Sequence, residues 1–356
     1  MSLRTALVLA LLAAVVATAA VLGGLELRNI EASVLREAQA RVDHGLQVIE
    51  GAYRHRLELT ADRLANRARE ARLEGDAAAA EMLRIQRDLG LSVLNLCDTA
   101  GRPLAGTHAP DAPPVPVAAD PVLRRALHGE RAFGTVRLTP ERIEREGGRA
   151  LAEAVVVREG GAGSALATGE ALFAWFAVPV LDAAGRTTAL LYGGRALNLD
   201  DALVDELRAL VFGDETFEGK PVGTVTLFLG GVRVATNVVG PGGARAVGTR
   251  VSPEVERQVL ELGRTWSDRA WVVDAWYLSG YRPLRDPDGA ILGMQYVGLL
   301  EAPYAAMRRS LVARSALTAG ALLLAAGVLG VLLVRGITRP LEDLGGAAHR
   351  MAEGDW

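Results

Sequence analysis

The sequence has almost none of the residues on which metal and redox sites are built. Cys97 is the only cysteine, so an internal disulfide bond is impossible and the fold must be stabilised by burial of apolar groups. The histidines are scattered without the spacing of metal ligands, at His44, His55, His108, His128 and His349. We therefore expect no metal ion and no cofactor.

Motifs of nucleotide binding and nucleophilic catalysis are also absent. The sequence holds no Gly-x-x-x-x-Gly-Lys-Ser/Thr loop and no Gly-x-Ser-x-Gly elbow, and Gly160-Gly161-Ala162-Gly163 is typical of a flexible loop. Lys220 is the only lysine and the net charge is −3, which disfavours a nucleic-acid partner. These absences argue against an enzyme in this segment. An ecto-enzyme is the alternative, and an adhesive or structural surface protein is a third class.

Charge is missing from two long stretches, and these divide the chain. Residues 5–25 and 315–334 are uncharged runs, each long enough to cross a hydrocarbon core of about 30 Å as a helix. The region between them is rich in Arg, Glu and Asp. Two membrane crossings would place this region on one side and both termini on the other. Ala17-Thr18-Ala19 leaves a cleaved signal peptide as the alternative for the first run.

Arginines near the two runs predict the orientation. Arg4 precedes the first run and Arg335 and Arg339 follow the second, so both termini are expected in the cytoplasm and the middle region in the periplasm or outside the cell. Three arginines on the outer side disagree: Arg308, Arg309 and Arg314. Long translocated domains are largely exempt from the charge rule, so the assignment stands. The predicted location is the inner (plasma) membrane, with two spans.

After the first run, apolar residues recur every three or four positions, which predicts an amphipathic helix from about Glu26 to Leu73 that ends before Gly75. The stripe consists of Ile30, Val34, Ala38, Val42, Leu46, Ile49, Tyr53, Leu57 and Leu64. At roughly 70 Å this helix is longer than a small domain needs, so it could carry displacement to the membrane or serve only as a scaffold. Its stripe could also pair with a second copy, and we expect a homodimer.

Strands and turns follow a second helix, which begins at Asp76 and ends near Gly90. Residues 92–96 predict a strand that leads into the turn Asp98-Thr99-Ala100-Gly101, and residues 110–116 form a proline-rich loop. A helix is expected near 121–127, with short strands after it. The small-residue segment 160–169 predicts a loop, and strands resume at 171–181 and 187–192.

An internal repeat shows how the middle region is organised. Five residues recur at one offset of 104: Pro179, Asp182, Gly185, Tyr192 and Gly194 match Pro283, Asp286, Gly289, Tyr296 and Gly298. Each copy predicts a strand, an Asp-x-x-Gly turn and a second strand. Residues 94–105 and 225–235 match more loosely as strand-turn-strand pairs. The fold class predicted is α+β, with two similar antiparallel-sheet domains at 91–203 and 204–314, after helices at 26–90.

The order of these elements resembles the double Cache sensors of bacterial receptors, most clearly after Val222. The motifs that carry the resemblance are Gly248-Thr249-Arg250-Val251-Ser252, residues 271–277 (Trp-Val-Val-Asp-Ala-Trp-Tyr) and residues 293–298 (Gly-Met-Gln-Tyr-Val-Gly). The resemblance implies two PAS-like antiparallel sheets, each with a small-molecule site between the sheet and its cap of helices and loops.

The C-terminal residues resemble the first helix of a HAMP domain, a cytoplasmic relay module. Residues 337–344 (Ile-Thr-Arg-Pro-Leu-Glu-Asp-Leu) and 351–355 (Met-Ala-Glu-Gly-Asp) follow the second uncharged run directly. Because the sequence stops at Trp356, we expect 335–356 to be a truncated HAMP domain of a longer receptor. A histidine kinase is the expected output domain of a two-component system, with a chemotaxis receptor as the alternative and a cyclic-dinucleotide enzyme as the third.

Aromatic residues and arginines on short strands are the candidate ligand-binding residues, because pockets combine apolar walls with a few fixed polar groups. In the second domain these are Arg233, Asn237, Arg269, Asp274, Trp276, Tyr277, Tyr281 and Tyr296. Alternation places Tyr277, Ser279 and Tyr281 on one face of a strand. The first domain offers His128, Arg137 and Trp175. Arg233 and Arg269 are the candidate clamps for a carboxylate, so the expected partner is an organic acid or amino acid.

The topology can be tested with compartment reporters fused after residues 150 and 356. Because the two spans bracket the middle region, the first fusion should report the periplasm and the second the cytoplasm. A fusion after residue 2, which should report the cytoplasm, is the control for the first span. Finding residues 150 and 356 in one compartment would contradict the predicted topology.

Overall fold

The computed structural model describes residues 3–71, 73, 77–106, 114–158, 167–240 and 242–333. These residues form two units. One unit contains Ala38–Glu301, and the other combines the N-terminal residues up to Glu37 with the chain from Ala302 onward. The truncated HAMP domain predicted at 335–356 and the Gly160–Gly163 loop lie outside the described residues.

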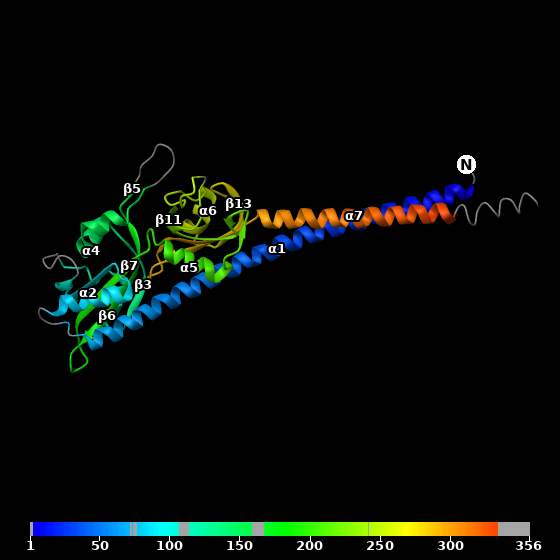
Figure 1. The fold of residues 1–356 in the computed structure, drawn as a ribbon. Helices are drawn as coiled ribbons and strands as arrows, with labels where there is room; N and C mark the ends of the chain where they lie inside the picture. The colour runs from blue at the N-terminus through cyan, green and yellow to red at the C-terminus, as the bar shows by residue number, and fades with distance from the viewer. Residues whose placement is uncertain are drawn as a thin grey trace, which may run out of the picture. The chain divides into compact units, whose positions relative to one another are not determined.

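One helix dominates the N-terminal part of the chain. Helix α1 covers Leu3–Glu70 and so joins the first uncharged run and the predicted amphipathic helix without a break (Figure 1). From Ala38 to Leu64 the predicted stripe is confirmed. The buried residues of this part of α1 are Ala38, Val42, Leu46, Ile49, Tyr53, Leu57, Ala61 and Leu64. Helix α2, Ala77–Leu89, follows at the position predicted for the second helix.

The first sheet has five antiparallel strands in the order β2-β1-β7-β6-β3. The strands are β1 (Val93–Asp98), β2 (Pro103–Gly106), β3 (Ala132–Leu138), β6 (Ala171–Leu181) and β7 (Thr187–Ala196). Helix α3, Pro121–Leu127, lies where the sequence predicted it and is capped by Asp120. A two-stranded ribbon, β4 (Val157–Arg158) with β5 (Ala167–Thr168), completes this half of the unit.

The second sheet repeats the first. Its order is β11-β10-β14-β13-β12, which is the same order when the strands of each sheet are counted along the chain. The strands are β10 (Gly223–Leu229), β11 (Val232–Thr236), β12 (Trp266–Val272), β13 (Ala275–Arg285) and β14 (Ile291–Leu300). The register is repeated too, because Trp175 pairs with Gly194 as Ser279 pairs with Gly298. The α+β class with two similar antiparallel sheets is therefore confirmed.

The repeated Asp-x-x-Gly turns share one set of hydrogen bonds. In β6-β7 the Asp182 carboxylate accepts from the backbone N–H groups of Ala184 and Arg186, at 2.9 Å each. Asp286 binds two N–H groups in β13-β14 in the same way, and Asp98 does so in β1-β2. Each turn ends in a glycine with positive φ, as at Gly185, where φ is 76°.

Three helices were not predicted from the sequence. Helix α4, Pro140–Ala154, begins at the cap Thr139 and is kinked at Gly148. Helix α5, Asp201–Phe212, spans the predicted domain boundary and is capped by Asp200. Helix α6, Pro253–Glu256, continues as the π-helix η1, Arg257–Glu261. A second small ribbon pairs β8 (Thr216–Phe217) with β9 (Lys220–Pro221). The domain boundary at 203/204 stays a prediction.

The residues of α1 after Ala38 pack on one face of both sheets. On the second sheet, a Cβ added at Gly280 would meet Leu46 at 2.6 Å, so the helix lies directly on strand β13. On the first sheet, the Tyr53 hydroxyl is hydrogen-bonded to Thr135 of β3 at 2.8 Å. The opposite face of the first sheet is covered by α3 and α4, and that of the second sheet by α6 and η1.

The tip of the β13-β14 hairpin joins the two sheets. Pro287 lies against Gly134 of β3, where an added Cβ would meet the proline ring at 2.4 Å. Both oxygens of the Asp288 carboxylate accept from Arg124 of α3 at 2.8 Å. The hairpin of one sheet therefore contacts a strand and a helix of the other.

The chain continues from β14 into α7, Ala302–Leu333. Among the described residues, Ala302–Leu332 is the helix that is long and apolar enough to cross a membrane. Its leucines are open to the surroundings, and Leu317, Leu322 and Leu324 are 77%, 71% and 73% exposed. This helix starts thirteen residues before the predicted run at 315–334. Crossing by residues 5–25 stays a prediction.

The packing of α1 can be tested at two leucines of that helix. Leu64 is fully buried and Leu59 is 43% exposed. Leu64→Ala should lower the free energy of unfolding by about 2–5 kcal/mol, because it leaves a cavity on the buried side of α1. Leu59→Ala is the control and should change it by less than about 0.5 kcal/mol. Urea unfolding followed by tryptophan fluorescence measures both, and equal losses would contradict the packing.

Candidate functional site

The second sheet gathers tyrosines on the face away from α1. Tyr277 and Tyr281 come from β13 and Tyr296 from β14, and all three are at most 4% exposed. Alternation along β13 places Ser279 between the two tyrosines, as predicted, because every second residue of a strand points to the same side. Opposite this face, Val255 and Val259 of α6 and η1 close the layer.

The rings form one continuous cluster. Tyr281 lies 4.7 Å from Tyr296 between ring centroids, 6.0 Å from Phe228 and 5.6 Å from Trp266. Phe228 is at the end of β10 and meets Tyr296 edge to face. This cluster is the apolar wall of the candidate site, and its polar groups are the tyrosine hydroxyls.

Arg233 of β11 points into this cluster. Its guanidinium lies over the Phe228 ring at 5.1 Å, and the residue is only 4% exposed. Among the described residues its side chain donates to Thr249 Oγ1, and no carboxylate oxygen lies within ion-pair distance. Burial lowers the pKa of Arg233 below its ordinary value, because no anion offsets the loss of water. The site therefore holds a buried cation without a counterion.

Two buried nitrogens near this strand lack an acceptor. Arg233 Nε makes no hydrogen bond among the described groups, and neither does Asn237 Nδ2, just beyond the end of β11. The Asn237 carbonyl oxygen is fixed, because it accepts from the Val225 N–H at 2.8 Å. Buried donors are normally satisfied, so an acceptor brought by a ligand would satisfy Arg233 Nε.

The tyrosines can act only as neutral hydroxyl groups. Burial raises the pKa of Tyr277, Tyr281 and Tyr296 above the ordinary value, and the charge of Arg233 lowers each of them by a smaller amount. Arg233 is therefore close to all three. One guanidinium and three phenol groups can donate hydrogen bonds to an oxyanion and surround an apolar side chain. None of them is arranged as a nucleophile with a base.

Three predicted residues of the second domain lie outside this cluster. Arg269 forms an ion pair with Glu301 at 2.5 Å and stacks on Trp276 at 4.0 Å from the ring centroid. Asp274 pairs with Lys220 at 2.7 Å. Arg269 and Trp276 are exposed, so their mutual contacts account for their positions. The structure brings together Arg233, Tyr277, Tyr281 and Tyr296, whereas the Asn237 amide binds the backbone of Val225.

The predicted residues of the first domain are dispersed. His128 forms the C-terminal cap of α3, and Arg137 is an exposed residue 3.8 Å from Glu170. Trp175 is fully buried on the face of the first sheet that carries α3 and α4, and its Nε1 has no acceptor among the described groups. Only Trp175 of these three therefore points between the sheet and its helices.

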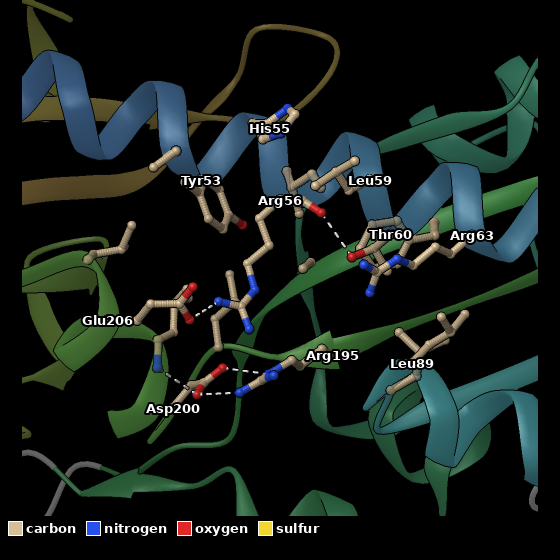
Figure 2. A pocket seen from close by; sticks show the side chains of 18 of the residues that line it. Tyr53, His55, Arg56, Leu59, Thr60, Arg63, Leu89, Arg195, Asp200 and Glu206 are labelled. Atoms are coloured by element: carbon tan, nitrogen blue, oxygen red, sulfur yellow. Dashed lines mark hydrogen bonds and ion pairs between the residues drawn. The ribbon is translucent and has the colours of Figure 1, made fainter. Parts of the chain in front are cut away.

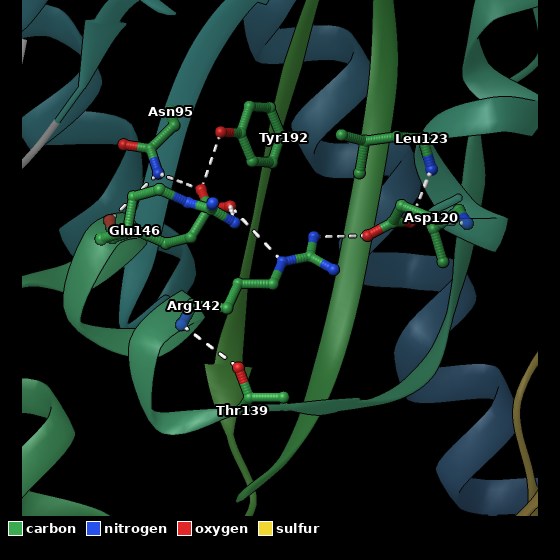
Figure 3. A network of polar contacts seen from close by, with 9 residues as sticks. Asn95, Asp120, Leu123, Thr139, Arg142, Glu146 and Tyr192 are labelled. Carbon is green, nitrogen blue, oxygen red and sulfur yellow. Dashed lines mark hydrogen bonds and ion pairs between the residues drawn. The ribbon is translucent and has the colours of Figure 1, made fainter. Parts of the chain in front are cut away.

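A buried polar network that the sequence did not predict lies around Arg142 (Figure 3), whose guanidinium is 5.4 Å from the centroid of the Trp175 ring. Arg142 of α4 bridges the carboxylates of Asp120 and Glu146. Glu146 also accepts from the Tyr192 hydroxyl at 2.7 Å and from the Asn95 amide at 3.0 Å. Helix α4 was not predicted, and without it nothing in the sequence places these residues together. The Thr139-Pro140 helix start was the available signal.

This network differs from the Arg233 cluster in charge. Burial alone would lower the pKa of Arg142, but Asp120 and Glu146 outweigh it and raise the pKa above the ordinary value. Burial, followed by the charge of Glu146, also raises the pKa of the nearby Cys97 thiol to about 12, so this thiol stays protonated at neutral pH. The first sheet therefore neutralises its buried arginine internally, and the second sheet does not.

Comparisons with known proteins agree with a sensor fold for part of the chain. Residues 195–311 match the family described as single cache domain 3, and these residues contain the second sheet and α5. No curated protein matches the sequence. The prediction of a second Cache domain around the first sheet remains untested.

Three solved structures to which the chain is similar are domains of sensory proteins. The periplasmic domain of Vibrio cholerae LuxQ is 10% identical with a TM-score of 0.40, covering 72% of this chain and 98% of that one. The sensor domain of the V. cholerae histidine kinase DctB is 12% identical with a TM-score of 0.37, covering 76% and 98%. The ligand-binding domain of the Pseudomonas fluorescens chemoreceptor CtaA, in complex with L-leucine, is 14% identical with a TM-score of 0.35, covering 76% and 96%.

The two buried arginines predict opposite effects of the same substitution. Arg233→Met removes a desolvated charge without stranding a partner, so the ligand-free protein should keep or gain stability. Arg142→Met strands Asp120 and Glu146 and should lower the free energy of unfolding by about 3–5 kcal/mol. Urea unfolding of the ligand-free protein measures both variants. If both substitutions destabilised the protein equally, contacts within the protein would already compensate the charge of Arg233. No ligand would then be needed to pair with it.

Proposed function

We propose that this chain is the sensor segment of a transmembrane receptor and that it binds a small carboxylate, an organic acid or amino acid, at Arg233. The observation that carries the proposal is the buried guanidinium of Arg233 with no carboxylate partner among the described residues. The family match at 195–311 supports a sensor domain, because the matched residues include the whole cluster around Arg233.

The energetics favour a ligand that brings its own negative charge. Removing a charged side chain from water costs several kcal/mol unless a partner is present. A carboxylate that accepts from Arg233 would supply that partner and could also satisfy Arg233 Nε. The neutral hydroxyls of Tyr277 and Tyr281 would complete its hydrogen bonds, and the rings of Phe228 and Tyr296 would contact its apolar part.

The opposite face of the same strands offers the path for the signal. Leu278, Gly280 and Arg282 alternate with the tyrosines along β13, and Gly280 and Arg282 contact α1 through Leu46 and Glu50. A shift of β13 caused by binding would therefore act on α1 directly. Since β14 ends one residue before α7, the other side of the site is linked by the chain to the apolar helix. Binding would change the populations of two helix arrangements.

The remaining parts of the receptor follow from the sequence. The exposed leucines of α7 suit a lipid environment. Residues 5–25 would form the other membrane crossing of the predicted topology. HAMP-like residues after the membrane would pass the signal from a homodimer to an output domain, for which a histidine kinase is our proposal and a chemotaxis receptor the alternative. The sensor segment itself would make or break no bond.

Ligand binding can be measured on the full chain in lipid nanodiscs. A panel of organic acids and amino acids should contain a compound that raises the melting temperature, because a ligand of the folded state stabilises it. Arg233→Gln should lower the affinity for that compound by about ten- to a hundredfold, because one charge-assisted hydrogen bond is lost. Arg269→Gln is the matched control, since Arg269 is exposed and paired with Glu301.

Two results would contradict the proposal. Equal affinity in the wild type and Arg233→Gln would show that Arg233 does not bind the carboxylate. Loss of binding in Arg142→Gln but not in Arg233→Gln would place the site on the first sheet, in the network around Asp120 and Glu146.

A further inference from the structure

A pocket lies on the face of the first sheet that carries α1, between that sheet, α1, α2 and α5. Its volume is about 450 Å³, within the range of small-molecule sites. Figure 2 shows α1 along one side, with Tyr53, Arg56 and Arg63, and α5 and α2 opposite, with Glu206 and Leu89. The pocket shares no residue with the Arg233 cluster.

The floor of this pocket is apolar. Six buried side chains form it: Leu57, Leu91, Phe176, Leu197, Leu203 and Leu207. Tyr53 also lines the pocket, and its hydroxyl is already hydrogen-bonded to Thr135. At the mouth, Leu59 is 43% and Leu210 58% exposed. Apolar surface thus continues from the interior to the opening, which suits a hydrocarbon chain.

The charged groups of the pocket leave one positive charge. Three arginines and two carboxylates line it: Arg56, Arg63, Arg195, Asp200 and Glu206. Arg195 donates to both oxygens of Asp200 at 2.6 and 2.7 Å, and Arg56 is paired with Glu206. Among the described residues no carboxylate oxygen lies within ion-pair distance of Arg63. Arg63 is therefore the cation available to an incoming anion.

We infer that this pocket binds a small amphipathic carboxylate, with its hydrocarbon chain on the leucine floor and its carboxylate on Arg63. A ligand with one negative charge would balance the unpaired positive charge of Arg63. A positively charged ligand would be repelled by Arg63. Since α1, α5 and strand β6 all contribute walls, the bound molecule would lie against the helix that also contacts the second sheet. It would therefore be a second input to the receptor, distinct from the ligand at Arg233.

Binding of radiolabelled octanoate to the full chain in lipid nanodiscs, measured by equilibrium dialysis, tests this inference. Octanoate should bind saturably to nanodiscs that contain the protein, after the octanoate bound by protein-free nanodiscs is subtracted. Acetate should compete poorly because it lacks the chain, and octylamine because it lacks the negative charge. Arg63→Gln should weaken octanoate by about tenfold, and Leu207→Trp, which fills the floor, should abolish saturable binding.

Three controls make the result decisive. Arg69→Gln changes an arginine of the same helix outside the pocket and should leave octanoate affinity unchanged. Arg233→Gln should also leave it unchanged, so that this inference and the proposed carboxylate sensor at Arg233 fail separately. Light scattering of Leu207→Trp should show an unaltered oligomeric state.

Other outcomes would overturn the inference. Equal binding of octanoate and octylamine, or equal losses in Arg63→Gln and Arg69→Gln, would mean partition into the lipid or unspecific attraction. A Leu207→Trp variant that changes oligomeric state while octanoate binding persists would show that the leucine floor contacts a second copy of the chain.

Discussion

The structure depends on one apolar stripe of α1, which packs against both sheets. From Ala38 to Leu64 this stripe buries a residue every three or four positions, so one face of the helix covers strands from two separate repeats. Each sheet alone would expose that face. Because the stripe belongs to a single rigid helix, the two sheets are held to a common partner, and any movement of one sheet along α1 must be accommodated by the other.

The two repeats share their topology but treat a buried arginine differently. In the first, Arg142 lies between Asp120 and Glu146, and Glu146 is held in turn by Tyr192 and Asn95. In the second, the residue that matches Tyr192 in register is Tyr296, yet no carboxylate accompanies it near Arg233. The charge of Arg142 is neutralised within its own sheet, whereas the charge of Arg233 is not. The two copies of this topology therefore differ in whether an arginine is left for an anion from outside.

Much of the fold could be predicted from the sequence, because its signals are local. The stripe of α1, the Asp-x-x-Gly turns and the paired strands at 171–181 and 187–192 each depend on residues close together in the chain. Helix α4 was missed because Gly147 and Gly148 interrupt its pattern and its apolar contacts come from distant strands. The shared face of Tyr277 and Tyr281 followed from strand alternation, but the position of Arg233 beside them did not. The lack of a counterion for Arg233 did not follow either, since only the three-dimensional structure shows which carboxylates are near. Arg269 and Trp276 were singled out for their residue types, although their partners are each other and Glu301.

The hairpin tip that seats Pro287 on Gly134 restricts how the two halves can diverge. Any side chain at position 134 would strike the proline ring, and loss of Asp288 would leave Arg124 without its bidentate partner. A change on one side of this contact is tolerated only with a matching change on the other. We therefore expect positions 134 and 287, and likewise 124 and 288, to vary as pairs. The contact makes the two sheets one unit rather than two interchangeable parts.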